Sequence, residues 1–191
     1  HAISTLTNKQ KSHLLSLFLT DNIDVENLTL KNLVSMGRIP YTNWHGKLLA
    51  KDNKIVEEAL NNVNLLHKAD CKISEVSDGE KQRAVIAKAL AQDTPLVLLD
   101  EPTAHLDLPN RIEVMLLLRR LSVTTEKTFI LSTHELDLAL QISDKIWLMT
   151  KDGIKKGIPE DLMLSNHFQS AFGSKSFYFD ENDGHCNLNQ L

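Results

Sequence analysis

Two adjacent carboxylates, Asp100 and Glu101, directly follow a short apolar run in the sequence. Residues 96–99 are all aliphatic and are entered from a proline, which is typical of a strand buried on both faces of a parallel sheet. In nucleotide hydrolysis the first acid of such a pair can hold Mg²⁺ through water, and the second can polarise the attacking water. An isolated Asp-Glu pair can equally cap a turn, so its meaning depends on the motifs around it.

A second candidate site lies one helix upstream, where Ser77, Asp78 and Gly79 precede a stretch of apolar residues at helical spacing. A serine hydroxyl and the unpaired N–H groups of a helix N-terminus offer hydrogen-bond donors and partial positive charge to a phosphate. Ser77 or Asp78 acting only as the N-cap of a surface helix is the alternative interpretation.

The elements that must position these residues alternate between strand and helix after residue 92. This alternation predicts an α/β core with its active edge at the carboxyl ends of the strands. Further upstream the pattern is almost purely helical, and Asp52 is a plausible N-cap for one of these helices. We expect helices over 28–36, 52–63, 77–91, 109–121 and 135–142, strands over 15–19, 96–99, 128–132 and 146–149, and a hairpin-like turn at 151–153.

The composition bounds the class of protein. The chain has 191 residues, 42% of them hydrophobic, and a formal net charge of −4, as expected for one soluble globular domain with room for a subdomain. Proteins that bind nucleic acids usually carry an excess of positive charge, which this chain lacks, so the sequence predicts no nucleic-acid partner. Its apolar runs are far shorter than the ~18 residues that span a bilayer. Cys71 and Cys186 stand far apart and are interpreted as ordinary reduced thiols.

The seven glycines contain no phosphate-binding loop of the form G-x-x-x-x-G-K-[ST]. No two glycines are five positions apart, and only Gly46 precedes a lysine, with Leu48 where Ser or Thr is needed. Residue 1 is His, and no cationic, apolar signal segment follows it. Because no initiator Met precedes this His, we expect the chain to begin inside or downstream of something longer.

Four motifs in order give the sequence its resemblance to a known family. Residues 96–103 resemble the Walker B segment of ATP-binding-cassette (ABC) ATPases, and residues 76–83 resemble the signature motif that precedes it. Residues 103–107 resemble the D-loop, and His134 after the apolar residues 129–131 resembles the switch histidine. The resemblance covers about residues 15–173. It implies an α/β fold with a P-loop NTPase (RecA-like) ABC ATPase core, incomplete at the N-terminus, and a helical subdomain.

The same resemblance implies a division of the chain into four parts. Residues 1–22 would be the remnant of the N-terminal core up to the Q-loop region, and residues 23–92 the helical subdomain with the signature motif at its end. Residues 93–150 would be the RecA-like core with Walker B, D-loop and switch histidine. Residues 151–191 would form a C-terminal tail.

The resemblance also assigns roles to residues, with ATP and Mg²⁺ as the implied cofactors. Glu101 and His134 would be catalytic, and Asp100 would hold Mg²⁺ through water. The Q-loop glutamine is absent, and Thr20 or Asp21 stands at its position and could offer an oxygen to hydrated Mg²⁺. The residues implied in ATP binding are Ser77, Asp78, Gly79, Glu80, Asp100 and Asp107.

Two positions depart from the usual signature motif: Asp78 replaces a glycine, and Glu80 replaces a common glutamine. A carboxylate that faces a phosphate repels it unless the carboxylate turns away or pairs with a cation. Asp107 has a simpler role beside its D-loop role, because it can cap the helix that opens at Pro109.

The implied partners are a second copy of the subunit, transmembrane permease subunits and, indirectly, a substrate-binding protein. Residues 36–44, followed by Gly46 and Leu48, resemble the bacterial importers of iron-siderophore complexes, haem and cobalamin. Such a subunit would lie at the cytoplasmic face of the inner membrane. Two alternatives stay open: a non-catalytic ABC-like interaction module, because the phosphate loop is missing, and an ABC ATPase outside transport.

Overall fold

The computed structural model describes residues 3–19, 27–42, 46–151, 153–165, 167–172, 177–179 and 186–188. The chain divides into two compact units, His1–Thr133 and His134–Leu191, and each is described here by itself. None of the helices in the described ranges combines the length and apolar character needed to cross a membrane.

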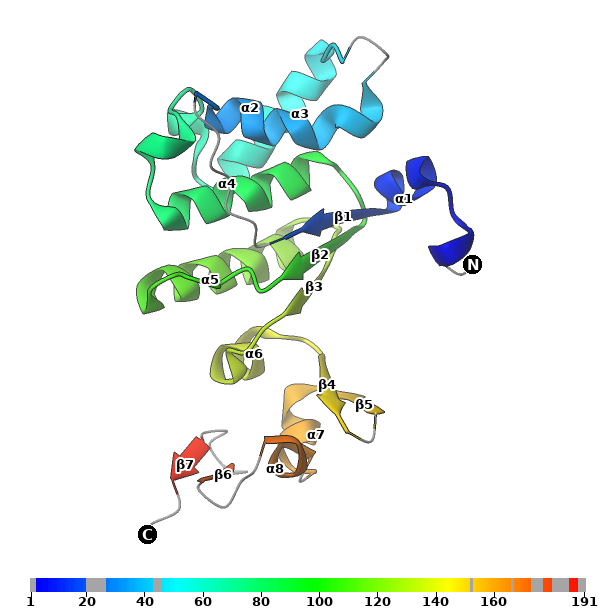
Figure 1. The fold of residues 1–191 in the computed structure, drawn as a ribbon, viewed down its shortest axis with the longest axis vertical. Helices are drawn as coiled ribbons and strands as arrows, with labels where there is room; N and C mark the ends of the chain where they lie inside the picture. The colour runs from blue at the N-terminus through cyan, green and yellow to red at the C-terminus, as the bar shows by residue number, and fades with distance from the viewer. Residues whose placement is uncertain are drawn as a thin grey trace. The chain divides into compact units, whose positions relative to one another are not determined.

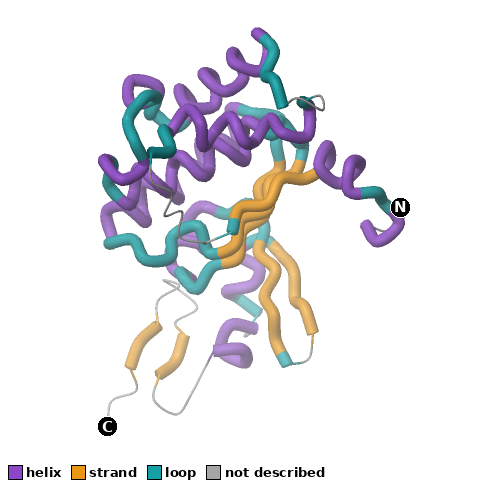
Figure 2. Tube along the Cα trace, turned by 45° about the horizontal axis from the view of Figure 1, so that its top comes forward, coloured by secondary structure: helices purple, strands orange, loops and turns teal. Residues whose placement is uncertain are grey.

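A three-stranded parallel sheet forms the centre of the first unit. Strands β1 (Leu15–Phe18), β2 (Leu96–Asp100) and β3 (Thr128–Ser132) lie in the order β1-β2-β3, side by side in Figures 1 and 2. The register pairs Asp100 at the end of β2 with Ser132 at the end of β3. The carboxyl ends of these two strands therefore meet at one edge, as the sequence predicted.

The two faces of this sheet are buried to different extents. Side chains on one face, such as Phe18, Val97 and Leu99, are buried, whereas Leu17 and Ile130 on the other face are 54% and 36% exposed. Residues on β2 follow the same alternation, because Leu96 and Leu98 are only half-buried. The prediction of a strand buried on both faces is therefore correct for one face only.

Three helices of the first unit pack together as a helical group, α2 (Leu30–Ser35), α3 (Ala50–Asn62) and α4 (Asp78–Ala91), which Figure 1 shows side by side. A 3-10 helix, Met36–Tyr41, continues α2 and packs on α4. Gly37 makes this packing close, because a Cβ there would lie 2.3 Å from the Lys88 carbonyl oxygen. The other two α-helices of this unit, among the described residues, are α1 (Asn8–Leu14) and α5 (Leu108–Thr124).

The start of α3 corrects one sequence-based expectation. The helix begins at Ala50, with Leu49 at the N-cap position, so Asp52 is not the N-cap. Asp52 lies in the first turn, where its Oδ2 accepts a hydrogen bond of 3.0 Å from the Leu49 N–H. Its other oxygen, Oδ1, accepts two bonds from the buried side chain of Arg38. Asp52 therefore combines a local bond at the start of α3 with a tertiary ion pair, which sequence spacing does not reveal.

The second unit contains a hairpin and short helices. Strands β4 (Ile146–Thr150) and β5 (Gly153–Gly157) are antiparallel, and Gly153 at φ 110° confirms the predicted turn. A small core formed by Leu148, Leu162 and Phe168 lies in this unit. The other elements are α6 (Leu136–Ile142), α7 (Pro159–Met163), α8 (His167–Phe172), β6 (Phe177–Phe179) and β7 (Cys186–Leu188).

The compact units and the sequence-based division of the chain place one boundary differently. The sequence assigned residues 93–150 to one core, whereas the first compact unit ends at residue 133. Within the described residues, β4 pairs with β5 in a two-stranded sheet and not with β1, β2 or β3. The four-part division of the chain remains a prediction.

Candidate functional site

The acid pair lies at the carboxyl edge of the parallel sheet. Asp100 ends β2, and Glu101 follows with φ 44°, in the left-handed region that side-chain-bearing residues rarely adopt. The Glu101 N–H donates to the Ser132 hydroxyl at 2.9 Å, and that hydroxyl donates to Asp100 Oδ1 at 2.6 Å. Ser132 therefore fixes both the backbone of one acid and the carboxylate of the other.

The motifs in the sequence did not indicate Ser132 as a site residue. The sequence did place it at the end of the predicted strand 128–132, where the carboxyl ends of parallel strands meet. The register itself, which pairs Asp100 with Ser132, depends on long-range strand pairing and cannot be obtained from local spacing.

The oxygen atoms at this edge suit a hard cation such as Mg²⁺. Mg²⁺ prefers oxygen ligands and is commonly held by one or two carboxylates together with phosphates and water. Asp100 supplies an exposed carboxylate, and Ser132 supplies a hydroxyl 2.6 Å from it. Over the described ranges, no three His, Cys, Asp or Glu side chains are grouped so that they could hold a metal. Mg²⁺ binding here would therefore depend on phosphate and water ligands as well.

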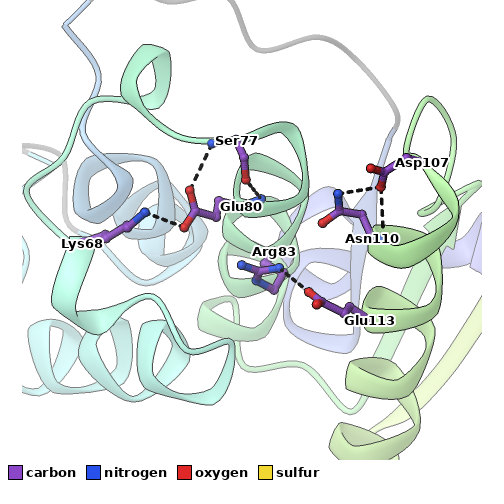
Figure 3. Close-up of polar contacts among 7 residues, drawn as sticks. All are labelled: Lys68, Ser77, Glu80, Arg83, Asp107, Asn110 and Glu113. Atoms are coloured by element: carbon purple, nitrogen blue, oxygen red, sulfur yellow. Dashed lines mark hydrogen bonds and ion pairs between the residues drawn. The ribbon is translucent and has the colours of Figure 1, made fainter.

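The signature segment forms the capped N-terminus of α4. Ser77 is the N-cap: its Oγ accepts from the Glu80 N–H at 3.3 Å, and its own N–H donates to Glu80 Oε2 at 3.0 Å (Figure 3). A hydroxyl that accepts one hydrogen bond can still donate another. The capping role of Ser77 is thus compatible with donation to an anion at this helix end.

The two unusual carboxylates of the signature segment both pair with lysines. Glu80, whose side chain is 16% exposed, accepts a bond of 2.6 Å from Lys68. This bond is the main cause that lowers the pKa of Glu80, against the effect of its burial. Asp78 is 79% exposed and pairs with Lys81 at 2.9 Å. Each carboxylate therefore has a neighbouring cation that offsets its charge near the helix N-terminus.

The D-loop segment is tied to the start of α5. Asp107 caps this helix, as the sequence predicted: its Oδ1 accepts from the Asn110 N–H at 3.1 Å and from Asn110 Nδ2 at 2.6 Å (Figure 3). The Asn110 side chain in turn covers Gly79, which is buried. This contact joins the D-loop segment to the signature segment.

Further contacts join α4 to the residues that follow β2. Gln82 Nε2 donates to the Pro102 carbonyl oxygen, next to the acid pair, and Arg83 pairs with Glu113 of α5 at 3.2 Å. The first unit thus brings the acid pair, the signature segment and Asp107 onto packed neighbouring elements. His134 begins the second unit. Thr20 and Asp21 lie outside the described residues, as does Trp44 of the segment that resembles siderophore importers.

Comparisons with known proteins agree with this order of motifs. The family model described as ABC transporter matches residues 3–104, more than half of the chain. An ABC transporter ATP-binding protein of Methanocaldococcus jannaschii is 34% identical over 97% of this chain and 64% of its own length. The petrobactin import ATP-binding protein FpuC of Bacillus anthracis is 39% identical over 76% of this chain and 54% of its own length.

A solved structure described as an inward-facing conformation of an ABC transporter superposes with a TM-score of 0.80 and 26% identity, over 93% of this chain and 72% of that one. The parallel sheet, the helical group and the motif order define an α/β nucleotide-binding fold of the P-loop NTPase class. The chain belongs to the ABC transporter family of ATP-binding proteins. It spans between 54% and 64% of the length of the curated relatives named above.

Proposed function

We propose that this chain is the larger part of the ATP-hydrolysing subunit of an importer for iron-siderophore complexes, haem or cobalamin. The acid pair at the end of β2, held by Ser132, is the observation that carries the catalytic part of the proposal. The substrate class is supported by relatives whose names describe import of petrobactin and of iron(3+)-hydroxamate.

In the proposed mechanism two copies face each other head to tail. Ser77 and Gly79 of one copy donate hydrogen bonds to the γ-phosphate of the nucleotide bound by the other copy, and Asp107 lies at the junction. Glu101 accepts a proton from the attacking water. Asp100 would hold Mg²⁺ through water, and that ion would neutralise phosphate charge. His134, Ser77 and Gly79 stabilise the negative charge that spreads in the transition state.

The proposed partners are transmembrane permease subunits, which place the protein at the cytoplasmic face of the cell membrane, and indirectly a substrate-binding protein. ATP-driven closure of the pair and its reopening after hydrolysis would be passed to the permease through the helical group. The relatives are named as import ATP-binding proteins, which supports this assembly.

Two observations support the presence, in the complete protein, of a further segment that binds the phosphates of the nucleotide. The seven glycines form no phosphate loop, and without such a loop the affinity for Mg-ATP is expected to be very poor. The sheet face with Leu17 and Ile130 is partly exposed, although parallel sheets are normally covered on both faces. A non-catalytic interaction module is the second candidate, favoured only by the missing loop.

Equilibrium ATP binding and phosphate release test the proposal. We expect the 191-residue chain to bind ATP weakly, and the protein expressed from its complete reading frame to contain a phosphate loop and hydrolyse ATP. Tight ATP binding by the 191-residue chain would contradict the argument from the missing loop. A complete reading frame without a phosphate loop would favour the non-catalytic module.

The unusual Asp78 gives a separate prediction for the complete protein. Asp78→Gly is expected to leave the rate of ATP hydrolysis unchanged or to raise it, because it removes a carboxylate beside the phosphate-facing donors. Lys81→Met is expected to lower the rate about two- to fivefold, because it leaves the charge of Asp78 without its cation. The size follows from the free energy of a surface ion pair, which is at most about 1 kcal/mol. The double variant should regain the rate of Asp78→Gly. A large loss of hydrolysis in Asp78→Gly alone would refute this account of the charge.

A further inference from the structure

Gly79 lies where another side chain fills the space that its own Cβ would need. A Cβ at position 79 would lie 2.2 Å from Asn110 Oδ1 and 2.8 Å from Asn110 Cγ. Both distances are far below van der Waals contact. Gly79 is the second residue of α4, and Asn110 lies in the first turn of α5. A side chain at position 79 would therefore have to displace the Asn110 amide.

The amide of Asn110 cannot rotate away from Gly79 without losing a bond. Its Nδ2 donates to Asp107 Oδ1 at 2.6 Å, and the Asn110 N–H donates to the same oxygen at 3.1 Å. Figure 3 shows the nitrogen of Asn110 turned to Asp107. With Nδ2 held there, Oδ1 faces Gly79. A methyl group at position 79 would displace the amide and release Asp107 from Asn110 Nδ2.

We propose that Asn110 is a positioning residue: it bonds to Asp107 of the D-loop segment and packs against Gly79 of the signature segment. It thereby fixes the positions of these two segments relative to each other, and both face the partner copy's nucleotide in the proposed dimer. This inference rests on the proposed function. It gives Gly79 a packing role toward the D-loop in addition to any contact with phosphate.

The rest of the α4–α5 contact does not depend on Asn110. Arg83 of α4 pairs with Glu113 of α5, so the helices keep another link when the amide is removed. Gln82 also joins α4 to the Pro102 carbonyl oxygen, ahead of α5. Alanine also has a higher helix propensity than glycine. Once Asn110 is removed, Gly79→Ala is therefore expected to be harmless to the fold.

A double-mutant cycle with Gly79→Ala and Asn110→Ala tests the proposal in two ways. In the 191-residue chain, Gly79→Ala should lower the melting temperature, whereas in the Asn110→Ala background the same change should leave it unchanged or raise it. In the protein expressed from its complete reading frame, each single change should lower kcat for ATP hydrolysis by about tenfold, with KM within about twofold of wild type. The double variant should be no slower than Asn110→Ala.

The control is Glu113→Gln, which alters another link between the same helices at an exposed position and should leave kcat unchanged. An equal loss of kcat from Gly79→Ala in both backgrounds would mean that the glycine serves only phosphate approach, and would overturn the proposal. Coupling seen in the melting temperature but not in kcat would reduce Asn110 to a packing residue and would also overturn it. If the complete wild-type protein hydrolyses no ATP, the proposed function is wrong and the positioning role falls with it, while the melting temperatures still report whether the contact exists.

Discussion

Glu101→Gln is expected to lower kcat for ATP hydrolysis by roughly 100- to 10,000-fold in the protein expressed from its complete reading frame. Glutamine keeps the shape of the side chain but cannot accept the proton of the attacking water. The Glu101 backbone is held by Ser132 and its φ is 44°, so the substitution leaves the backbone bond in place. The KM for ATP should change little, because in the proposed mechanism Glu101 acts on water and not on nucleotide binding.

The same variant should trap the associated state. If hydrolysis reopens the pair of subunits, Glu101→Gln should form a stable ATP-dependent dimer that size-exclusion chromatography detects. The matched control is Glu126→Gln. Glu126 is exposed and precedes β3, at the end of that strand away from Ser132, so this variant should hydrolyse ATP at the wild-type rate. A Glu101→Gln variant that keeps more than a tenth of the wild-type kcat would exclude Glu101 as the general base.

The parts of the site that local chemistry determines were predictable from the sequence. Ser77 and Asp107 each precede a helix and cap it through the N–H three residues later, which is the interaction that favours these residue types at N-caps. The apolar residues before Asp100 predicted that β2 is a strand, although its partner strands β1 and β3 are distant in the sequence. At the two N-caps, the capping residue and its partner lie only three positions apart.

The parts that depend on long-range pairing were not predictable. Ser132 meets Asp100 only because β2 and β3 pair in one register, and Asn110 meets Gly79 only because α4 and α5 pack together there. The strand over 146–149 and the hairpin-like turn after it were predicted, but β5, the strand that pairs with β4, was not. Spacing along the chain shows which residues share a face of an element, and it does not show which faces meet.

The role of Asp52 depends on a tertiary partner that its local sequence does not indicate. Its substitution is expected to lower the free energy of unfolding more than any other of the proposed substitutions. Arg38 Nε and Nη2 donate to Asp52 Oδ1 at 3.0 and 2.9 Å, and Arg38 Nη1 donates to the Ala91 carbonyl oxygen at 2.9 Å. The two side chains are 3% and 1% exposed. This pair therefore joins the 3-10 helix after α2, the start of α3 and the end of α4.

Asp52→Asn is expected to lower the free energy of unfolding by about 3–5 kcal/mol, because it leaves the Arg38 charge buried without a counter-charge. Urea denaturation of the 191-residue chain, followed by its helical circular dichroism, measures the loss. The matched control on the same helix is Glu58→Gln. Glu58 pairs with Lys54 at 3.9 Å, with side chains 62% and 79% exposed, so we expect a loss of at most about 0.5 kcal/mol. Equal losses in the two variants would contradict the importance of the buried pair.

The pH dependence of the difference in unfolding free energy between wild type and Asp52→Asn gives an independent check. The hydrogen bond from the Leu49 N–H is the largest cause that lowers the pKa of Asp52 below its ordinary value, and Arg38 adds to it against the effect of burial. A carboxyl whose pKa is lower in the folded state stabilises the fold fully at pH values above its unfolded pKa of about 3.9. That stabilisation is lost as the pH falls from there through the folded pKa. The difference in unfolding free energy between wild type and Asp52→Asn should thus be constant near neutral pH and shrink below about pH 4. A difference that instead grows in acid would show that the Asp52 pKa is raised in the folded protein and that the ion pair does not hold it ionised.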